Sequence, residues 1–258
     1  PDQITTDIAA LNPHNAERDL MVRVKRQTWS RFMPALHKFT IAINNKCGES
    51  EPFEHSAFLP HEVFHTLYEH GPEAFWKIMG SPADLLEFWR GAAELNDGWY
   101  RNHPVVQRVG EPRSRVPFGF HGDDAGVHGQ EQVLVITWGS VATKQCTLDS
   151  RIVFTMLKVA HILTPDTLQV VYKVFAWSLN ALSTGKFPAA DHNDVKFSKD
   201  HHPERFAKVG NDLAGGLCGA YAEMRGDWKY LKEALYLKQF YGRKDLICHR
   251  CAVLNQVQ

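Results

Sequence analysis

Hydrophobic residues recur with two different periods along the chain, and the change from one period to the other divides it into two regions. In the first region, apolar residues recur at spacings close to 3.6, which predicts an amphipathic helix. The residues that carry this pattern are Leu20, Val24, Trp29, Phe32, Leu36 and Phe39. Residues 61–69 and 82–100 show the same period, so we expect residues 1–105 to form a helical N-terminal region.

After residue 104 the pattern becomes strand-like. Short segments rich in Val, Ile and Phe lie at 116–121, 132–138 and 151–158, separated by Gly, Asp, Ser and Thr. They predict three strands joined by short loops in an antiparallel meander. A helix is expected from 165 to 182, ending before Gly185, a residue type favoured at that position.

The last part of the chain alternates between polar and apolar stretches. Residues 186–212 predict a loop, 213–224 a strand or a helix, and 228–240 a helix. The expected fold class is therefore α/β (α+β). A helical region over 1–105 precedes a core over 106–258, which has a mixed sheet and flanking helices.

Composition limits the partners and the compartment. The 258 residues carry 29 Lys and Arg against 29 Asp and Glu, so there is no general basic excess and any nucleic-acid site has to be local. Five cysteines without regular spacing favour a reducing compartment. Apolar runs are too short to cross a bilayer, and no signal peptide is evident, so we expect a soluble intracellular protein, nuclear or cytoplasmic, without a membrane partner.

Two acidic turns stand out, Gly122-Asp123-Asp124 after an expected strand and Gly226-Asp227 before an expected helix. Three strands, a helix, another strand and then an acid is the element order of the ribonuclease-H-like fold, in which carboxylates on the first and fourth strands bind Mg²⁺ or Mn²⁺. Two such ions about 4 Å apart catalyse phosphoryl transfer. We predict Asp123 and Asp227 as catalytic metal ligands, with Asp124 as the competitor of Asp123, because adjacent strand residues point to opposite faces. The simpler interpretation is a turn and a helix cap.

Two further motifs have the spacing of zinc sites. Cys248 and Cys251 match half of a tetrahedral Zn²⁺ site, and the alternative is a pair of ordinary reduced cysteines. His61-Glu62-Val63-Phe64-His65 matches H-E-x-x-H, in which two imidazoles on one helix face bind zinc, with Glu87 as a candidate third ligand. Pro60 places His61 in the first helical turn, which counts against a zinc metallopeptidase.

Several segments of the chain together resemble a known group of sequences. They are Leu59-Pro60-His61-Glu62, His121-Gly122-Asp123, Gly185-Lys186-Phe187-Pro188, Asp191-His192, Gly226-Asp227-Trp228 and Cys248-x-x-Cys251. The chain resembles, over about residues 55–252, the repeat-borne proteins abundant in dinoflagellate genomes. These are similar, more distantly, to DNA transposases of the DDE type.

The resemblance implies that Asp123 and Asp227 hold metal, that Cys248 and Cys251 lie in a zinc-bound insertion, and that DNA is the partner. A third acid is expected on a later helix, and the sequence ends before one. The resemblance therefore implies a transposase-derived protein whose ancestral activity is metal-dependent DNA cleavage and strand transfer, inactive alone or a domesticated or decayed remnant. The alternative is a non-catalytic module that binds nucleic acid or protein.

Overall fold

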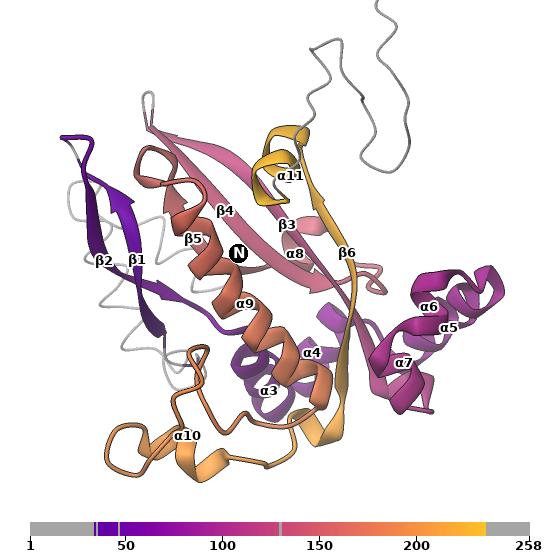
Figure 1. Ribbon diagram of the computed structural model, residues 1–258. Helices are drawn as coiled ribbons and strands as arrows, with labels where there is room; N and C mark the ends of the chain where they lie inside the picture. Colours follow the sequence, from indigo (N-terminus) through magenta and orange to yellow (C-terminus); the bar gives the residue numbers. More distant parts are fainter. Residues whose placement is uncertain (1–33, 35, 46, 129–130, 236–258) are drawn as a thin grey trace, which may run out of the picture. The chain divides into compact units, whose positions relative to one another are not determined.

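The structure is a computed structural model that describes residues 34, 36–45, 47–128 and 131–235. The chain divides into two units, Pro1–Ala35 and Leu36–Gln258, and the second unit is the one described below. It is a mixed α+β structure with a two-stranded and a four-stranded sheet (Figure 1). The strands are β1 (His37–Asn44), β2 (Ser50–Ala57), β3 (Arg115–His128), β4 (Glu131–Ser140), β5 (Ile152–Lys158) and β6 (Cys218–Gly226).

The helices lie between these strands and after the last of them. They are α3 (Pro60–His70), α4 (Pro72–Met79), α5 (Pro82–Leu95), α6 (Gly98–Asn102), α7 (Pro104–Arg108), α8 (Thr147–Ser150), α9 (Asp166–Thr184), α10 (Pro203–Lys208) and α11 (Trp228–Ala234). Short 3-10 turns are η2 (Pro112–Ser114), η3 (Val159–His161) and η4 (Ala214–Gly216). The helix predicted over 165–182 is confirmed, and Gly185 ends it in the left-handed conformation, with its N–H donating to the carbonyls of Ala181 and Leu182.

The larger sheet has the strand order β5-β4-β3-β6. β3 pairs antiparallel with β4, and β4 pairs antiparallel with β5, so the predicted meander is confirmed. β6 adds to the free edge of β3 in the parallel direction, which the long connection through α9 makes possible. The strands predicted at 116–121, 132–138 and 151–158 are therefore the first three strands of this sheet.

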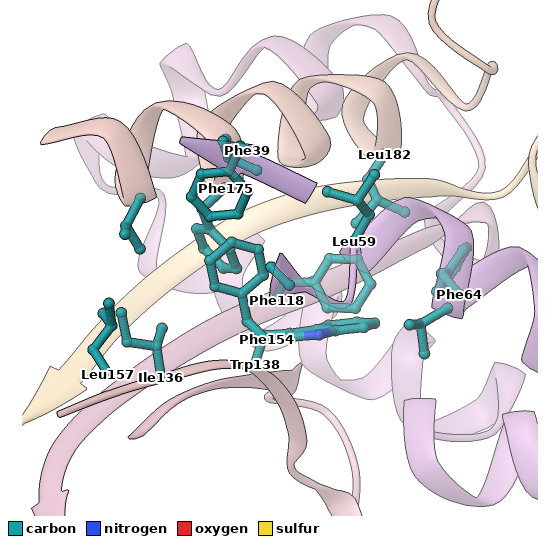
Figure 2. Packing of buried hydrophobic residues seen from close by; sticks show 14 of the residues in the cluster. Phe39, Leu59, Phe64, Phe118, Ile136, Trp138, Phe154, Leu157, Phe175 and Leu182 are labelled. Atoms are coloured by element: carbon teal, nitrogen blue, oxygen red, sulfur yellow. The ribbon is translucent and has the colours of Figure 1, made fainter. Parts of the chain in front are cut away.

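One face of the larger sheet is packed against α9 (Figure 2). Phe175 of α9 contacts Phe154 of β5 and Phe120 of β3, with ring centroids 4.7 and 5.2 Å apart. Trp138 and Phe118 extend this layer, 5.3 Å apart between ring centroids. The same core includes buried side chains of β1, α3 and α4, so both halves of the described chain contribute to it.

Two sequence expectations are corrected. Residues 37–57, expected within the helical region, form the β1–β2 hairpin, and Phe39 lies on a strand. Buried Phe39, Ile41 and Ile43 alternate with more exposed neighbours, a period of two that the wider helical spacing of Leu36 and Phe39 obscured. The second correction is that β3 continues to His128, so Asp123 and Asp124 lie within a strand and not in a turn at its end.

Candidate functional site

The candidate site lies where the parallel strands β3 and β6 end their pairing. Gly122 of β3 is paired with Gly226 of β6, and this is the last register pair between the two strands. Asp123 is the next residue of β3, and Asp227 is the residue directly after β6. Because neighbouring strands lie about 4.8 Å apart, this register brings the two acids to the same level of the sheet.

The ring of Tyr230 fixes this end of the sheet. It packs so closely over Gly122 and Gly226 that a Cβ at either glycine would collide with it. The Tyr230 side chain is buried, and its hydroxyl is 2.7 Å from that of Tyr172 on α9. The two glycines therefore let α11 approach the sheet directly after Asp227.

The three candidate acids have different surroundings. Asp124 is bound by Lys229 of α11, with 2.5 Å between Nζ and Oδ2. Asp227 is the N-cap of α11, because its Oδ1 accepts the N–H of Tyr230 at 2.7 Å. Asp123 is exposed, and its side chain makes no hydrogen bond or ion pair with any residue that the structure describes. The simpler interpretation of Asp227 as a helix cap is thus confirmed, and it leaves the second carboxylate oxygen of Asp227 available.

The face of the sheet opposite α9 carries a polar cavity of about 210 Å³. Its floor includes Gly119 of β3 and Gly139 of β4, which are register partners. A Cβ on Gly119 would lie 2.9 Å from Cγ of Glu223, and a Cβ on Gly139 would lie 2.6 Å from the carbonyl oxygen of Ser150. The cavity therefore depends on two facing positions that have no side chain.

Charged side chains of β6 and of the residue before β5 line this cavity, together with His121 of β3. Arg225 of β6 is paired with Glu223, with 2.7 Å between Nε and Oε1. Arg151, which directly precedes β5, also lines the cavity, and burial followed by the charge of Arg225 lowers its pKa. Burial lowers the pKa of His121 too, with Arg151 the next cause, whereas Asp123 and Asp227 act in the opposite direction. The charges of both acids and both arginines therefore act on the pKa of His121.

The His61-Glu62-x-x-His65 motif lies on α3, as expected, but its side chains have other partners. His61 is buried, and its Nδ1 is 2.8 Å from Oγ of Ser178 on α9. Nδ1 of His65 accepts the N–H of Ala214 at 3.2 Å. Glu87 lies on α5 and is paired with Lys144 at 3.1 Å. In the described ranges no group of three or more His, Cys, Asp or Glu residues could hold a metal ion, so His61, His65 and Glu87 do not form one.

Glu62, the acidic residue between these histidines, connects α3 to a polar network. Glu62 accepts a hydrogen bond of 2.9 Å from Nε of Arg205 on α10. Arg205 also donates to Nδ1 of His37 at 3.0 Å, so Nε2 of His37 carries the proton and donates to Nδ1 of His192 at 3.2 Å. Burial, with Arg205 as the next cause, lowers the pKa of both His37 and His61 to about 3. These neutral rings hold the polar segment 186–212 against α3 and β1.

The sequence singles out the acids but does not predict the cavity beside them. Glu223, Arg225 and Asp227 alternate along β6, and this period of two was the available signal, although the glycines of 213–224 left the strand undecided. Arg151 had no signal, because its proximity to Arg225 depends on the strand order. Cys248 and Cys251 lie outside the described residues, so the zinc insertion stays a prediction.

Comparison of the chain with protein-family models, curated proteins and solved structures gives no match. Among the helices of the described residues, none combines the length and the apolar character that a membrane span needs.

Proposed function

We propose that this chain derives from a DDE-type DNA transposase and that its sheet is a ribonuclease-H-like core, in which Asp123 and Asp227 hold Mg²⁺ or Mn²⁺ for DNA strand cleavage and transfer. The observation that carries the proposal is the common level of these two acids on adjacent parallel strands, each one residue beyond the pair Gly122–Gly226. The two acids are more than a hundred positions apart in the sequence, and the parallel pairing of β3 with β6 brings them to the same end of these strands.

The strand order supports the same proposal. In a ribonuclease-H-like core three antiparallel strands are followed by a helix and by a fourth strand parallel to the first. Here the first three positions correspond to β3, β4 and β5, the helix to α9, and the fourth strand to β6. The predicted acids belong to the first strand and to the end of the fourth, as the resemblance implies.

The surroundings of the two acids fit a hard divalent cation. Carboxylate oxygens are the ligands that Mg²⁺ prefers. Asp123 has both oxygens available among the described residues, and Asp227 has one after capping α11. When bound, the ion would supply a Lewis acid that activates water or a hydroxyl and stabilises the leaving oxygen. The chain contributes the position of Asp227, which the cap and Tyr230 hold fixed, and a cationic surface beside the acids from Arg151 and Arg225.

A plasmid-nicking assay in Mn²⁺ tests this function. Asp123→Asn and Asp227→Asn keep the shape of each side chain, and Asn also caps a helix well, so α11 stays intact. We expect nicking to fall by at least about 100-fold in both variants. Asp124→Asn is the matched control, because Asp124 is already bound to Lys229, and it should nick as the unchanged protein does. Equal nicking in all four proteins would refute the assignment.

A non-catalytic DNA-binding module is the second candidate. It is favoured because, among the residues that the structure describes, no group of three or more His, Cys, Asp or Glu side chains could hold a metal ion. The two arginines beside the acids would then hold the DNA backbone without metal. DNA binding that is unaffected by EDTA, together with no nicking in Mn²⁺, would favour this module over the nuclease.

A further inference from the structure

The polar cavity on the open face contains a guanidinium that no described carboxylate contacts directly. Arg151 is half-buried, and its guanidinium makes no hydrogen bond or ion pair with any described residue, although the charges of Glu223 and Asp123 act on its pKa. The charge of Arg225 lies close enough to lower the pKa of Arg151 further than burial alone. Two guanidinium groups gathered in a partly desolvated hollow repel each other, and an anion between them would relieve this cost.

Among the described residues, the one carboxylate that lines the cavity is paired directly with Arg225 alone. Glu223 contacts Nε of Arg225 and lies over Gly119, whose missing side chain makes room for it. The terminal nitrogens of Arg225 have no partner among the described residues. Because a guanidinium presents a fork of N–H groups that matches a phosphate, both arginines keep donors for an incoming oxyanion.

The size and the remaining lining of the cavity also fit a small oxyanion. Its volume of about 210 Å³ is below the range of roughly 300–1,000 Å³ that is usual for small-molecule pockets. Thr147 and Gln145 line it, and neither side chain has a hydrogen bond to another described residue. The hollow therefore suits a single phosphate group surrounded by polar donors.

The cavity lies next to the two acids along β3 and β6. Arg225 lies two residues before Asp227 on β6, and its register partner His121 lies two residues before Asp123 on β3. Two residues of a parallel strand advance the chain by about 6.6 Å. A phosphate at this level would be a neighbour, along an extended DNA strand, of a phosphate at the level of Asp123 and Asp227.

We propose that this cavity is an oxyanion subsite in which Arg151 and Arg225 hold the phosphate next to the one that Asp123 and Asp227 would act on. The proposal rests on the proposed function for its DNA partner. It assigns a separate, metal-independent role to the arginines: they position the strand, and they carry no catalytic step.

The test measures binding of a fluorescein-labelled single-stranded DNA oligonucleotide by anisotropy in EDTA, over a series of salt concentrations. Arg151→Gln and Arg225→Gln should each weaken binding about tenfold and reduce the salt slope by about 0.7, the value for one lost phosphate contact to a single strand. Arg90→Gln, at an exposed position of α5, is the control with the same change in net charge and should leave both quantities unchanged. Circular dichroism of each variant establishes that it is folded.

Two further proteins separate this subsite from its alternatives. Arg151→Lys keeps the charge, so it should keep the salt slope and still weaken binding if the guanidinium fork holds the phosphate. Asp123→Asn should bind the oligonucleotide at least as well as the unchanged protein, because EDTA removes any metal contribution. Equal binding by Arg151→Gln, Arg225→Gln and Arg90→Gln would overturn the subsite, whatever the nicking assay shows. Binding of inorganic phosphate without binding of the oligonucleotide would overturn the assignment to DNA.

Discussion

Asp123 and Asp227 lie at the same level of two adjacent parallel strands, each one residue beyond the paired Gly122 and Gly226. Asp123 belongs to a strand that continues past it, whereas Asp227 follows the last residue of β6 and is the N-cap of α11. One acid is therefore held by the sheet and the other by a helix cap. Any cation bound by both would depend on the contact between α11 and the sheet.

That contact can be tested at the glycines beneath Tyr230. Gly122→Ala and Gly226→Ala each place a methyl group against the Tyr230 ring, and we expect each to lower the free energy of unfolding by about 1–3 kcal/mol. Urea denaturation measures the change. Gly126→Ala, on the same strand with nothing within 4 Å of its added Cβ, should change stability by less than about 0.5 kcal/mol.

A double variant separates the steric cause from a general intolerance of the strand. Gly122→Ala combined with Tyr230→Ala should be less destabilised than the sum of the two single variants, because the collision is then absent. Simple additivity of the two effects would mean that the ring does not hold α11 against Gly122.

The two faces of β5 give a second prediction. Phe154 is fully buried against Phe175 of α9, so Phe154→Ala should cost about 3–5 kcal/mol in urea denaturation. The adjacent Val153 is 36% exposed on the opposite face, and Val153→Ala should cost less than about 1 kcal/mol. Similar costs for the two variants would contradict the assignment of α9 to one face of the sheet.

The network of buried histidines predicts how stability depends on pH. The pKa of His61 falls from 6.5 to about 3 in the folded protein, so the folded state keeps its ring neutral while the unfolded state takes up a proton below about pH 6.5. Stability is therefore fully present above pH 6.5 and is lost as the pH falls from 6.5 towards 3. His37 acts in the same direction.

Urea denaturation at pH 7.5, 6, 5 and 4 measures this dependence. His61→Gln should reduce the loss of stability between pH 6.5 and 4, although its stability at pH 7.5 is lower, since the contact with Ser178 changes. His201→Gln, at an exposed position, should keep the full loss. If the stability of His61→Gln fell as steeply between pH 6.5 and 4 as that of the unchanged protein, the buried ring would not be the cause of the loss at low pH.

Much of the sheet could be predicted from the sequence, because the β-branched segments and the polar stretches between them are local signals. The pairing of β6 with β3 could not, since Leu213–Gly226 contains glycines that weaken both strand and helix patterns. The β1 strand was missed because Phe39 fits a helical spacing with Leu36 as well as an alternation with Ile41. The acids could be singled out from short sequence motifs. The cavity beside them could not, because it depends on how strands far apart in the sequence pair with one another.

The capping role of Asp227 gives a further prediction. Asp227→Ala removes both the cap and the carboxylate and should cost about 1 kcal/mol of stability, whereas Asp227→Asn should keep most of that stability. Thermal denaturation of the two variants measures the difference. If both variants are equally stable, Asp227 does not cap α11 in solution.

Isothermal titration of Mn²⁺ measures directly whether Asp123 and Asp227 share a cation, because it requires neither a DNA target nor a third acid. We expect Mn²⁺ to bind to the unchanged protein and to Asp124→Asn, and the heat to be lost in both Asp123→Asn and Asp227→Asn while each variant remains folded. Heats that are the same in all four proteins would contradict the claim that Asp123 and Asp227 jointly hold a divalent cation.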